Sequence, residues 1–252
     1  MSFVYPASRA KPSLHPLNVK NCIIDRYKDK MTRKHFLSKR LTVVTVLALA
    51  VLAILAEALP GYLAYSDKPS KADVAVLFIG RDYRSRIKKA RTLISEGYTD
   101  RLIISVYDLF IGTIEMTGKN GSSWERMPAS IVDPDKLEHD INVMRARNPQ
   151  YHPYLENTHV ETLESKRMMD RYGFRSALFV SSPGHMRRIR MIAGDVFDSE
   201  RYRIAFVPTR FEQPPEGLHR YPPARMAGAA LECVKILWFQ TYRLGAGKTE
   251  SK

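Results

Sequence analysis

The sequence predicts an α/β fold: a three-layer Rossmann-like sandwich with a mainly parallel sheet, preceded by one N-terminal transmembrane helix. Three observations support this prediction. Short apolar runs alternate with longer stretches of helical periodicity, as in βαβ units. The strand-like runs are apolar throughout, as expected of strands that are buried on both faces. Residues 41–56 contain no charged side chain.

The uncharged segment 41–56 is the candidate membrane helix. With the apolar residues on either side it approaches the roughly 20 residues that cross a bilayer. Pro60 and Gly61 are expected to end the helix, and Tyr62 and Tyr65 are placed to lie at the membrane interface. We assign residues 41–62 to the membrane helix and 63–72 to a linker. A buried core helix and a cleaved signal peptide are the alternatives, disfavoured by the flanking charge and by the long basic segment that precedes it.

The charges before this helix predict its orientation. Residues 1–40 form a basic arm with ten Lys or Arg against two Asp, a net charge of +8. By the positive-inside rule the N-terminus is cytoplasmic and the main domain lies across the membrane. We therefore expect a single-pass inner-membrane protein with a periplasmic or otherwise extracytoplasmic domain. The lipid bilayer is an expected partner and nucleic acid is not, because most of the +14 charge lies in the arm beside the membrane.

The main domain is expected over residues 73–244, followed by a tail over 245–252. Its expected elements are, in order, a strand over 73–80, a helix over 85–96, a strand over 102–106 and a helix over 134–147. Residues 107–131, rich in Gly and Ser, are expected to form a long loop. The later elements are a helix over 158–172, a strand over 176–181, a helix over 184–197, a strand over 203–208 and a helix over 222–244. Gly97 and Gly173 are expected just after the ends of two of these helices.

The end of the strand over 176–181 is the most informative part of the domain. Ser182 and Pro183 suit the N-cap and the first position of a helix. Helix N-termini at the carboxyl edge of a parallel sheet bind anions. His185, in the first turn, is the candidate catalytic residue, because imidazole exchanges protons near neutral pH. Arg188 follows one turn later and can point to the same crevice, whereas Arg187 and Arg190 are expected to face solvent.

The helix over 158–172 begins with a second candidate motif. Thr158 and Glu161 have the spacing of a capping box, in which each side chain bonds the other residue's backbone amide. This accounts for Glu161 without any further role. Asn157 and Thr158 are nevertheless placed at the expected edge of the sheet, where they can border a ligand site.

Taken in order, these motifs resemble the YdcF-like domain family of SanA- and ElyC-type envelope proteins, a domain of unknown function. The resemblance covers roughly residues 72–244. It is carried by the strand over 73–80, the helix over 90–97, the Glu156-Asn157-Thr158 segment, residues 180–188 and residues 231–238.

The resemblance implies a role in cell-envelope integrity or in peptidoglycan or lipid-carrier metabolism. It also implies a crevice that binds a phosphorylated or otherwise anionic ligand. The partners implied are a phosphorylated or lipid-linked envelope metabolite and envelope-biogenesis proteins. The expected site comprises the catalytic His185 and the ligand-binding residues Arg84, Asn157, Thr158, Ser182 and Arg188. Arg86 is the alternative to Arg84 as the arginine that follows the first strand.

The chain departs from the family at two turns. Gly80-Arg81-Asp82 and Ser105-Val106-Tyr107 stand where the family has glycine-rich turns, and side chains there block close approach of a phosphate to the backbone. These departures favour a non-catalytic envelope scaffold or binding module as a second function. A third, suggested by the Rossmann-like layout, is a nucleotide or S-adenosylmethionine binding protein. No residues have the spacing of a zinc site, so no metal is expected. The sequence identifies no cofactor.

Overall fold

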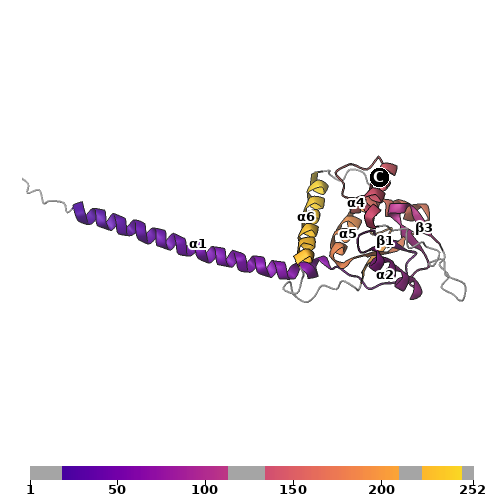
Figure 1. Cartoon of the computed structure of the whole chain (residues 1–252), viewed down its shortest axis with the longest axis horizontal. Helices are drawn as coiled ribbons and strands as arrows, with labels where there is room; N and C mark the ends of the chain where they lie inside the picture. Colours follow the sequence, from indigo (N-terminus) through magenta and orange to yellow (C-terminus); the bar gives the residue numbers. More distant parts are fainter. Residues whose placement is uncertain (1–18, 113–133, 210–222, 246–252) are drawn as a thin grey trace, which may run out of the picture. The chain divides into compact units, whose positions relative to one another are not determined.

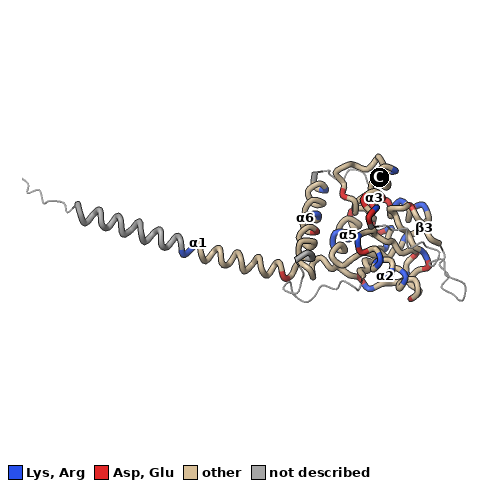
Figure 2. Tube along the Cα trace, viewed as in Figure 1, with Lys and Arg blue, Asp and Glu red and all other residues tan. Residues whose placement is uncertain are grey.

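The computed structural model describes residues 19–112, 134–209 and 223–245 (Figure 1). The chain divides into two units, residues 1–54 and residues 55–252. Helix α1 (Val19–Leu63) begins in the first unit and ends in the second. Within it, Lys39–Leu63 is long and apolar enough to cross a membrane, and Figure 2 shows that the part of α1 between Arg40 and Glu57 carries no charge.

The expected end of this helix at Pro60 and Gly61 is wrong. α1 continues to Leu63 with Pro60 inside it. Proline lacks an amide hydrogen, but in the last turn this removes a single helical hydrogen bond. The turn is closed by the Ala64 amide, which donates to the Pro60 carbonyl over 3.0 Å. The Arg187 guanidinium donates to the Tyr62 carbonyl over 2.8 Å, so the terminal carbonyls of the helix find partners.

The second unit contains a five-stranded sheet with the order β3-β2-β1-β4-β5. All neighbouring strands are parallel except β2 and β3, which are antiparallel. This confirms the prediction of a mainly parallel sheet, and two strands have the predicted bounds. The strands are β1 (Val74–Leu77), β2 (Leu102–Ile104), β3 (Leu109–Ile111), β4 (Ser176–Ser181) and β5 (Arg203–Pro208).

β3 lies in the segment that the sequence analysis assigned to a long loop, so that assignment is wrong for its first residues. A short 3-10 helix over Ser105–Tyr107 follows β2. Asp108 then adopts the left-handed conformation, with φ of 51°, which non-glycine residues seldom adopt but Asp tolerates. The chain thereby reverses and β3 pairs with β2. The remainder of the expected loop, residues 113–131, lies outside the described residues.

The helices of the domain begin and end close to their predicted positions. After α2 and α4, Gly97 and Gly173 adopt φ values of +74° and +73°, the left-handed conformation that commonly ends a helix. The helices are α2 (Tyr83–Ser95), α3 (Leu137–Arg147, preceded by a 3-10 turn over Pro134–Lys136), α4 (Asn157–Arg171), α5 (Pro183–Val196) and α6 (Pro223–Gly245).

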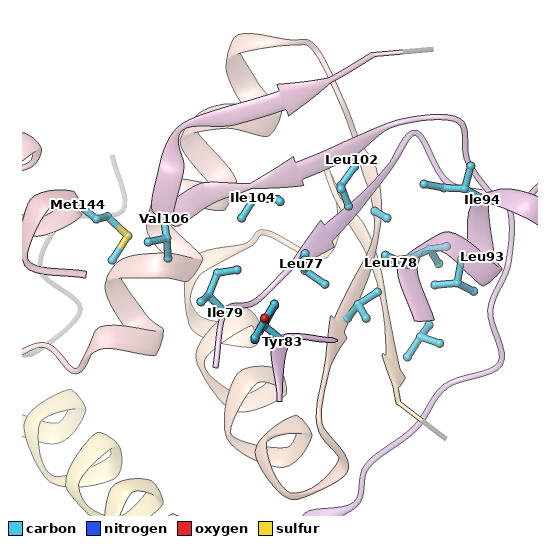
Figure 3. Packing of buried hydrophobic residues seen from close by; sticks show 14 of the residues in the cluster. Leu77, Ile79, Tyr83, Leu93, Ile94, Leu102, Ile104, Val106, Met144 and Leu178 are labelled. Carbon is cyan, nitrogen blue, oxygen red and sulfur yellow. The ribbon is translucent and has the colours of Figure 1, made fainter. Parts of the chain in front are cut away.

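The sheet is buried on both faces because its strands are apolar on both faces. In β1, Ala75 and Leu77 pack on one side with α2 and α3 residues, a cluster shown in part in Figure 3. Val74 and Val76 pack on the other side, mainly with α4 and α5 residues. Successive side chains of a strand point to opposite faces, so a continuous apolar run fills two cores at once.

The chain adds strands to the sheet in opposite directions from β1 and from β4, so the strand order reverses between these two strands. From β1 the chain passes through α2 to β2 on one side, and from β4 it passes through α5 to β5 on the other. In open α/β sheets the crevice at such a point, outside the carboxyl ends of the strands, is where ligands bind.

Candidate functional site

A cavity of about 700 Å³ lies at the carboxyl ends of β1 and β4. Its wall includes the residues that begin α2, α4 and α5, together with residues of the last turn of α1 and of α6. Three helix N-termini therefore contribute positive potential to one space. A cavity of this size accommodates a ligand of metabolite size.

His185 stands in this wall, in the first turn of α5. Its side chain is 35% exposed, and Nδ1 lies 3.1 Å from Oε1 of the buried Glu232 in α6. A carboxylate only accepts hydrogen bonds, whereas Arg188 Nη2, 3.4 Å from the same nitrogen, only donates. The closer contact, with Glu232, assigns the proton to Nδ1. The lone pair of the neutral imidazole is then on Nε2, which is the arrangement that a general base requires.

Arg188 joins three helices at the back of the site. Its Nε donates to Glu232 Oε2 over 2.7 Å and its Nη2 to Glu232 Oε1 over 3.3 Å. Nη1 donates to Glu156 Oε2 over 2.7 Å and to Thr158 Oγ1 over 2.6 Å. Arg188 is 3% exposed and Glu232 is 4% exposed, so the charged groups of α4, α5 and α6 meet away from solvent.

The two glutamates around Arg188 respond differently to burial. Burial favours the neutral form of Glu232, but hydrogen bonds and charges from His185 and Arg188 outweigh it and hold the pKa of Glu232 below its ordinary value. For Glu156, burial outweighs the attraction of Arg188 and raises the pKa. Of the two glutamates, Glu232 is therefore the one that stays anionic, and it is also the one that orients His185.

Arg86, rather than Arg84, is the arginine that reaches the cavity after the first strand. Its Nη1 donates to the Phe78 carbonyl over 2.9 Å, its Nη2 donates to Ser182 Oγ over 2.8 Å, and it pairs with Asp82 at 2.6 Å. A Cβ at Gly80 would lie 2.5 Å from Nη2 of Arg86. A side chain at position 80 would therefore displace the Arg86 guanidinium, which occupies the space where that side chain would be.

Arg84 is exposed and lies outside the cavity wall. Its Nε donates to the Tyr83 hydroxyl over 3.1 Å. Both arginines follow β1 closely, but Tyr83 and Arg86 are the buried residues of this turn of α2, so the helix turns Arg84 away from the site. Arg86, and not Arg84 as expected, therefore lines the cavity, and a binding role for either arginine stays a prediction.

The other predicted site residues, His185, Asn157, Thr158, Ser182 and Arg188, all line the cavity. Asn157 Oδ1 accepts a hydrogen bond from Arg145 Nε over 2.9 Å. Ser182 is the N-cap residue of α5 by position, with Pro183 following as predicted, but its hydroxyl bonds Arg86 rather than the helix. The binding roles of these residues stay predictions.

The interpretation of Thr158 and Glu161 as a capping box is wrong. Glu161 is instead a residue of the cavity wall. α4 begins one residue earlier, with Glu156 at the N-cap position. Thr158 Oγ1 accepts from Arg188, and Glu161 Oε1 accepts from the Ile79 amide at the end of β1 over 2.8 Å. Glu161 is 6% exposed and lines the cavity. Burial raises its pKa to about 8, against the opposing effects of the Ile79 amide, Arg86 and Arg188.

Arg187 and Arg190 do not simply face solvent. The Arg187 guanidinium lies 4.5 Å from the ring centre of Tyr62 and 5.1 Å from that of Tyr65, and Arg190 lies 4.4 Å from that of Tyr65. These cation–π contacts join α5 to the residues at the end of α1. The sequence interpretation missed them because the tyrosines and arginines are more than 120 residues apart.

The sequence around Glu232 contains a pattern that indicates a buried carboxylate. In α6 it shares one helical face with Ile236 and Phe239, which are 8% and 1% exposed, since positions separated by four and seven residues lie in one row. A carboxylate on the buried face of a helix needs a cationic partner. This pattern indicates a buried ion pair, although it does not name Arg188 or His185 as the partners.

The donors in the cavity suit an anion better than a metal. Across residues 19–112, 134–209 and 223–245, no group of three or more His, Cys, Asp or Glu side chains is placed to hold a metal ion. Guanidinium groups, an ammonium group, an imidazole and helix N-termini recognise carboxylates and phosphates.

Comparison of the chain with protein-family models, with curated proteins and with solved structures gives no significant match.

The pKa of Glu161 predicts a specific pH dependence of stability. The folded chain holds the proton up to about pH 8, against an ordinary pKa of 4.5. The stability that this proton contributes is therefore complete below the ordinary pKa and is lost as the pH rises through about 8. Glu161→Gln keeps an oxygen for the Ile79 amide and removes the titration. Between pH 5 and pH 8, the stability of the variant should rise relative to the native chain by up to roughly 1.4 kcal/mol per pH unit.

Urea unfolding of the detergent-solubilised full chain at several pH values measures this difference. Glu138→Gln, at an exposed position of α3, is the control and should show no such slope. Parallel curves for the native chain and Glu161→Gln would show that Glu161 is not held in its neutral form.

Proposed function

We propose that the cavity binds the phosphate or another anionic group of an envelope metabolite. The observation that carries the proposal is the convergence of three helix N-termini and two buried arginines on one space at the switch point of the sheet. The hydroxyl of Ser181 supports it further. It is fully buried, it lies in the cavity wall, and it has no hydrogen-bond partner in the described part of the chain.

The charge of the wall is also in favour of an anion. Four cationic side chains face three carboxylates, and one of those carboxylates, Glu161, is largely neutral at pH 7 because its pKa is about 8. The imidazole of His185 adds a further positive charge when it is protonated. The cationic residues are Arg81, Arg86, Arg188 and Lys235, and the acidic ones are Asp82, Glu161 and Glu232.

Two of the cations stand out as ligand contacts. Arg86 and Arg188 are held by Asp82, Glu156 and Glu232, so they shape the wall. Arg81 is exposed and lines the cavity, and Lys235 is partly exposed beside Glu232. Arg81 and Lys235 can therefore turn toward a ligand at little cost.

His185 is the residue that we propose for chemistry at the bound group. Glu232 holds the imidazole by Nδ1, so that Nε2 is available to accept a proton from the ligand or to return one to it. Because His185 and Arg188 lower the pKa of Glu232, the carboxylate stays an acceptor for the Nδ1 proton before and after such a transfer.

We further propose that the chain is a YdcF-like protein of the cell envelope with a three-layer Rossmann-like domain. Its support is the order of motifs over residues 73–80, 156–158, 180–188 and 231–238, which border one cavity or pack behind it.

We propose that α1 anchors the chain in the inner membrane, with the N-terminus in the cytoplasm and the domain in the periplasm. The basic arm and the apolar segment Lys39–Leu63 support this orientation. Its partners would be the bilayer, a lipid-linked or phosphorylated metabolite and envelope-biogenesis proteins.

A reporter fusion tests this orientation. Alkaline phosphatase fused after Ser70 should be active, because that enzyme folds only where disulfides form, across the membrane. Fusion after Lys30 should give an inactive reporter. The opposite pattern would reverse the orientation.

The charge of Arg81 should matter for binding and that of Arg84 should not. Arg81→Gln removes a cation from the cavity wall, so we expect the affinity of the full chain for inorganic phosphate to fall about tenfold, the effect of one charge-assisted hydrogen bond. Arg84→Gln removes an equal charge three residues away and outside the cavity, so the affinity should stay within about twofold, because solvent screens the charge. Calorimetric titration of the detergent-solubilised proteins measures both, and equal losses would point to a non-specific charge effect.

A non-catalytic envelope scaffold is the second candidate, and one observation favours it. The most buried cations, Arg86 and Arg188, already have carboxylate partners, so the wall is stable without a ligand. In that case the domain would recruit envelope enzymes through its surface or through its membrane helix.

Two variants separate the candidates in a strain that depends on this protein for envelope integrity. If the cavity is the functional site, His185→Ala should abolish complementation at normal protein level, and exchange of residues 41–56 for an unrelated membrane helix should preserve it. A scaffold that acts through its membrane helix predicts the reverse result for both. Unchanged complementation by His185→Ala would contradict the proposed proton transfer by His185.

A further inference from the structure

Helix α6 exposes an apolar face although its opposite face is buried in the domain. Glu232, Ile236 and Phe239 are buried. The exposed large side chains recur every three or four residues, so they lie on one side of the helix. They are Leu231 at 53%, Val234 at 60%, Leu237 at 65% and Trp238 at 51% exposed. A helix that is apolar on both faces is ordinarily covered on both.

The exposed face carries no unpaired charge. Between residues 226 and 244 the charged side chains are Glu232, Lys235 and Arg243. Lys235 pairs with Glu232 at 3.1 Å, and Arg243 pairs with Asp195 of α5 at 2.8 Å. An apolar surface of this length is unfavourable in water and favourable at the boundary between lipid headgroups and acyl chains, where the paired charges of Lys235 and Arg243 can reach the headgroups.

The position of α6 in the domain indicates what covers this face. Gly228, Ala229 and Leu231 of α6 line the same cavity as Leu63 and Ala64. Leu63 is the last residue of the segment long and apolar enough to cross a membrane. The first half of α6 and the end of that segment therefore border one space at the same side of the domain.

The residues around the end of that segment have the character of a membrane interface. Tyr62 lies in the last turn of the apolar segment and Tyr65 just after it, and Arg187 and Arg190 of α5 lie against their rings. Tyrosine is enriched at headgroup level, and arginine extends its charge there from an apolar surface. The exposed Trp238 of α6 has the same preference.

We propose that the exposed face of α6 lies in the headgroup region of the leaflet from which α1 emerges, with Leu231, Val234, Leu237 and Trp238 in contact with the acyl chains. This inference rests on the proposed membrane anchor. It gives α6 two roles, because the buried face of the same helix presents Glu232 and Lys235 to the cavity. The cavity is then held at the level where the phosphate of a lipid-linked metabolite would lie.

The test uses the fluorescence of Trp238 in the full chain. The chain has two tryptophans, so Trp124→Phe leaves Trp238 as the reporter. The protein is reconstituted into phosphatidylcholine and phosphatidylglycerol vesicles with or without acyl chains brominated near the headgroup. Insertion at the interface predicts at least about twofold quenching by the brominated lipid and weak quenching by aqueous iodide. Glu200→Trp in a chain that lacks both native tryptophans is the control, since residue 200 is exposed next to β5.

Each other outcome overturns the proposal in a distinct way. Quenching of Trp238 by iodide, as in the Glu200→Trp control, would mean that the face is exposed to water. Protection from both iodide and brominated lipid would mean that a second copy of the chain covers it. Failure of the protein to float with the vesicles would instead contradict the membrane anchor, which separates that result from a failure of α6 alone.

Discussion

The site depends on the buried ion pair between Arg188 of α5 and Glu232 of α6. Transferring a guanidinium and a carboxylate out of water costs several kcal/mol for each ion, and this is offset only when the hydrogen bonds of both groups are complete. Here Glu156, Thr158 and His185 complete them. The pair therefore constrains α4, α5 and α6 to a single arrangement around the cavity, and a change at either residue would leave the other buried charge without its closest partner across α5 and α6.

The cavity consequently has an inner and an outer set of charges. Arg86 and Arg188 are buried and engaged by carboxylates, and Gly80 provides the space that Arg86 needs. Arg81, His185 and Lys235 are more exposed and line the same space. The inner set makes the wall rigid, whereas the outer set provides groups that can meet an anion or exchange a proton. The site can therefore bind an anion although its two buried arginines already have carboxylate partners.

Sequence reasoning succeeded where local signals act alone. The apolar run of β4 and the Ser182-Pro183 start of α5 need no tertiary contact to be recognised, and the structure confirms both. β3 was missed because three apolar residues become a strand only through pairing with β2. Arg84 and Arg86 were indistinguishable because only the packing of α2 shows that Arg86 is buried and Arg84 exposed. The capping box failed because Arg188 and the Ile79 amide, both distant in sequence, bind Thr158 and Glu161 instead.

The central claim is that this wall, organised by Arg188 and Glu232, is an anion site. Crystals of the full chain soaked in tungstate, a phosphate mimic visible by its anomalous scattering, test it most directly. The account predicts tungstate in the cavity, within hydrogen-bond distance of His185 Nε2 and of the Arg81 or Lys235 side chain. Tungstate bound at other basic positions while the cavity holds none would contradict it.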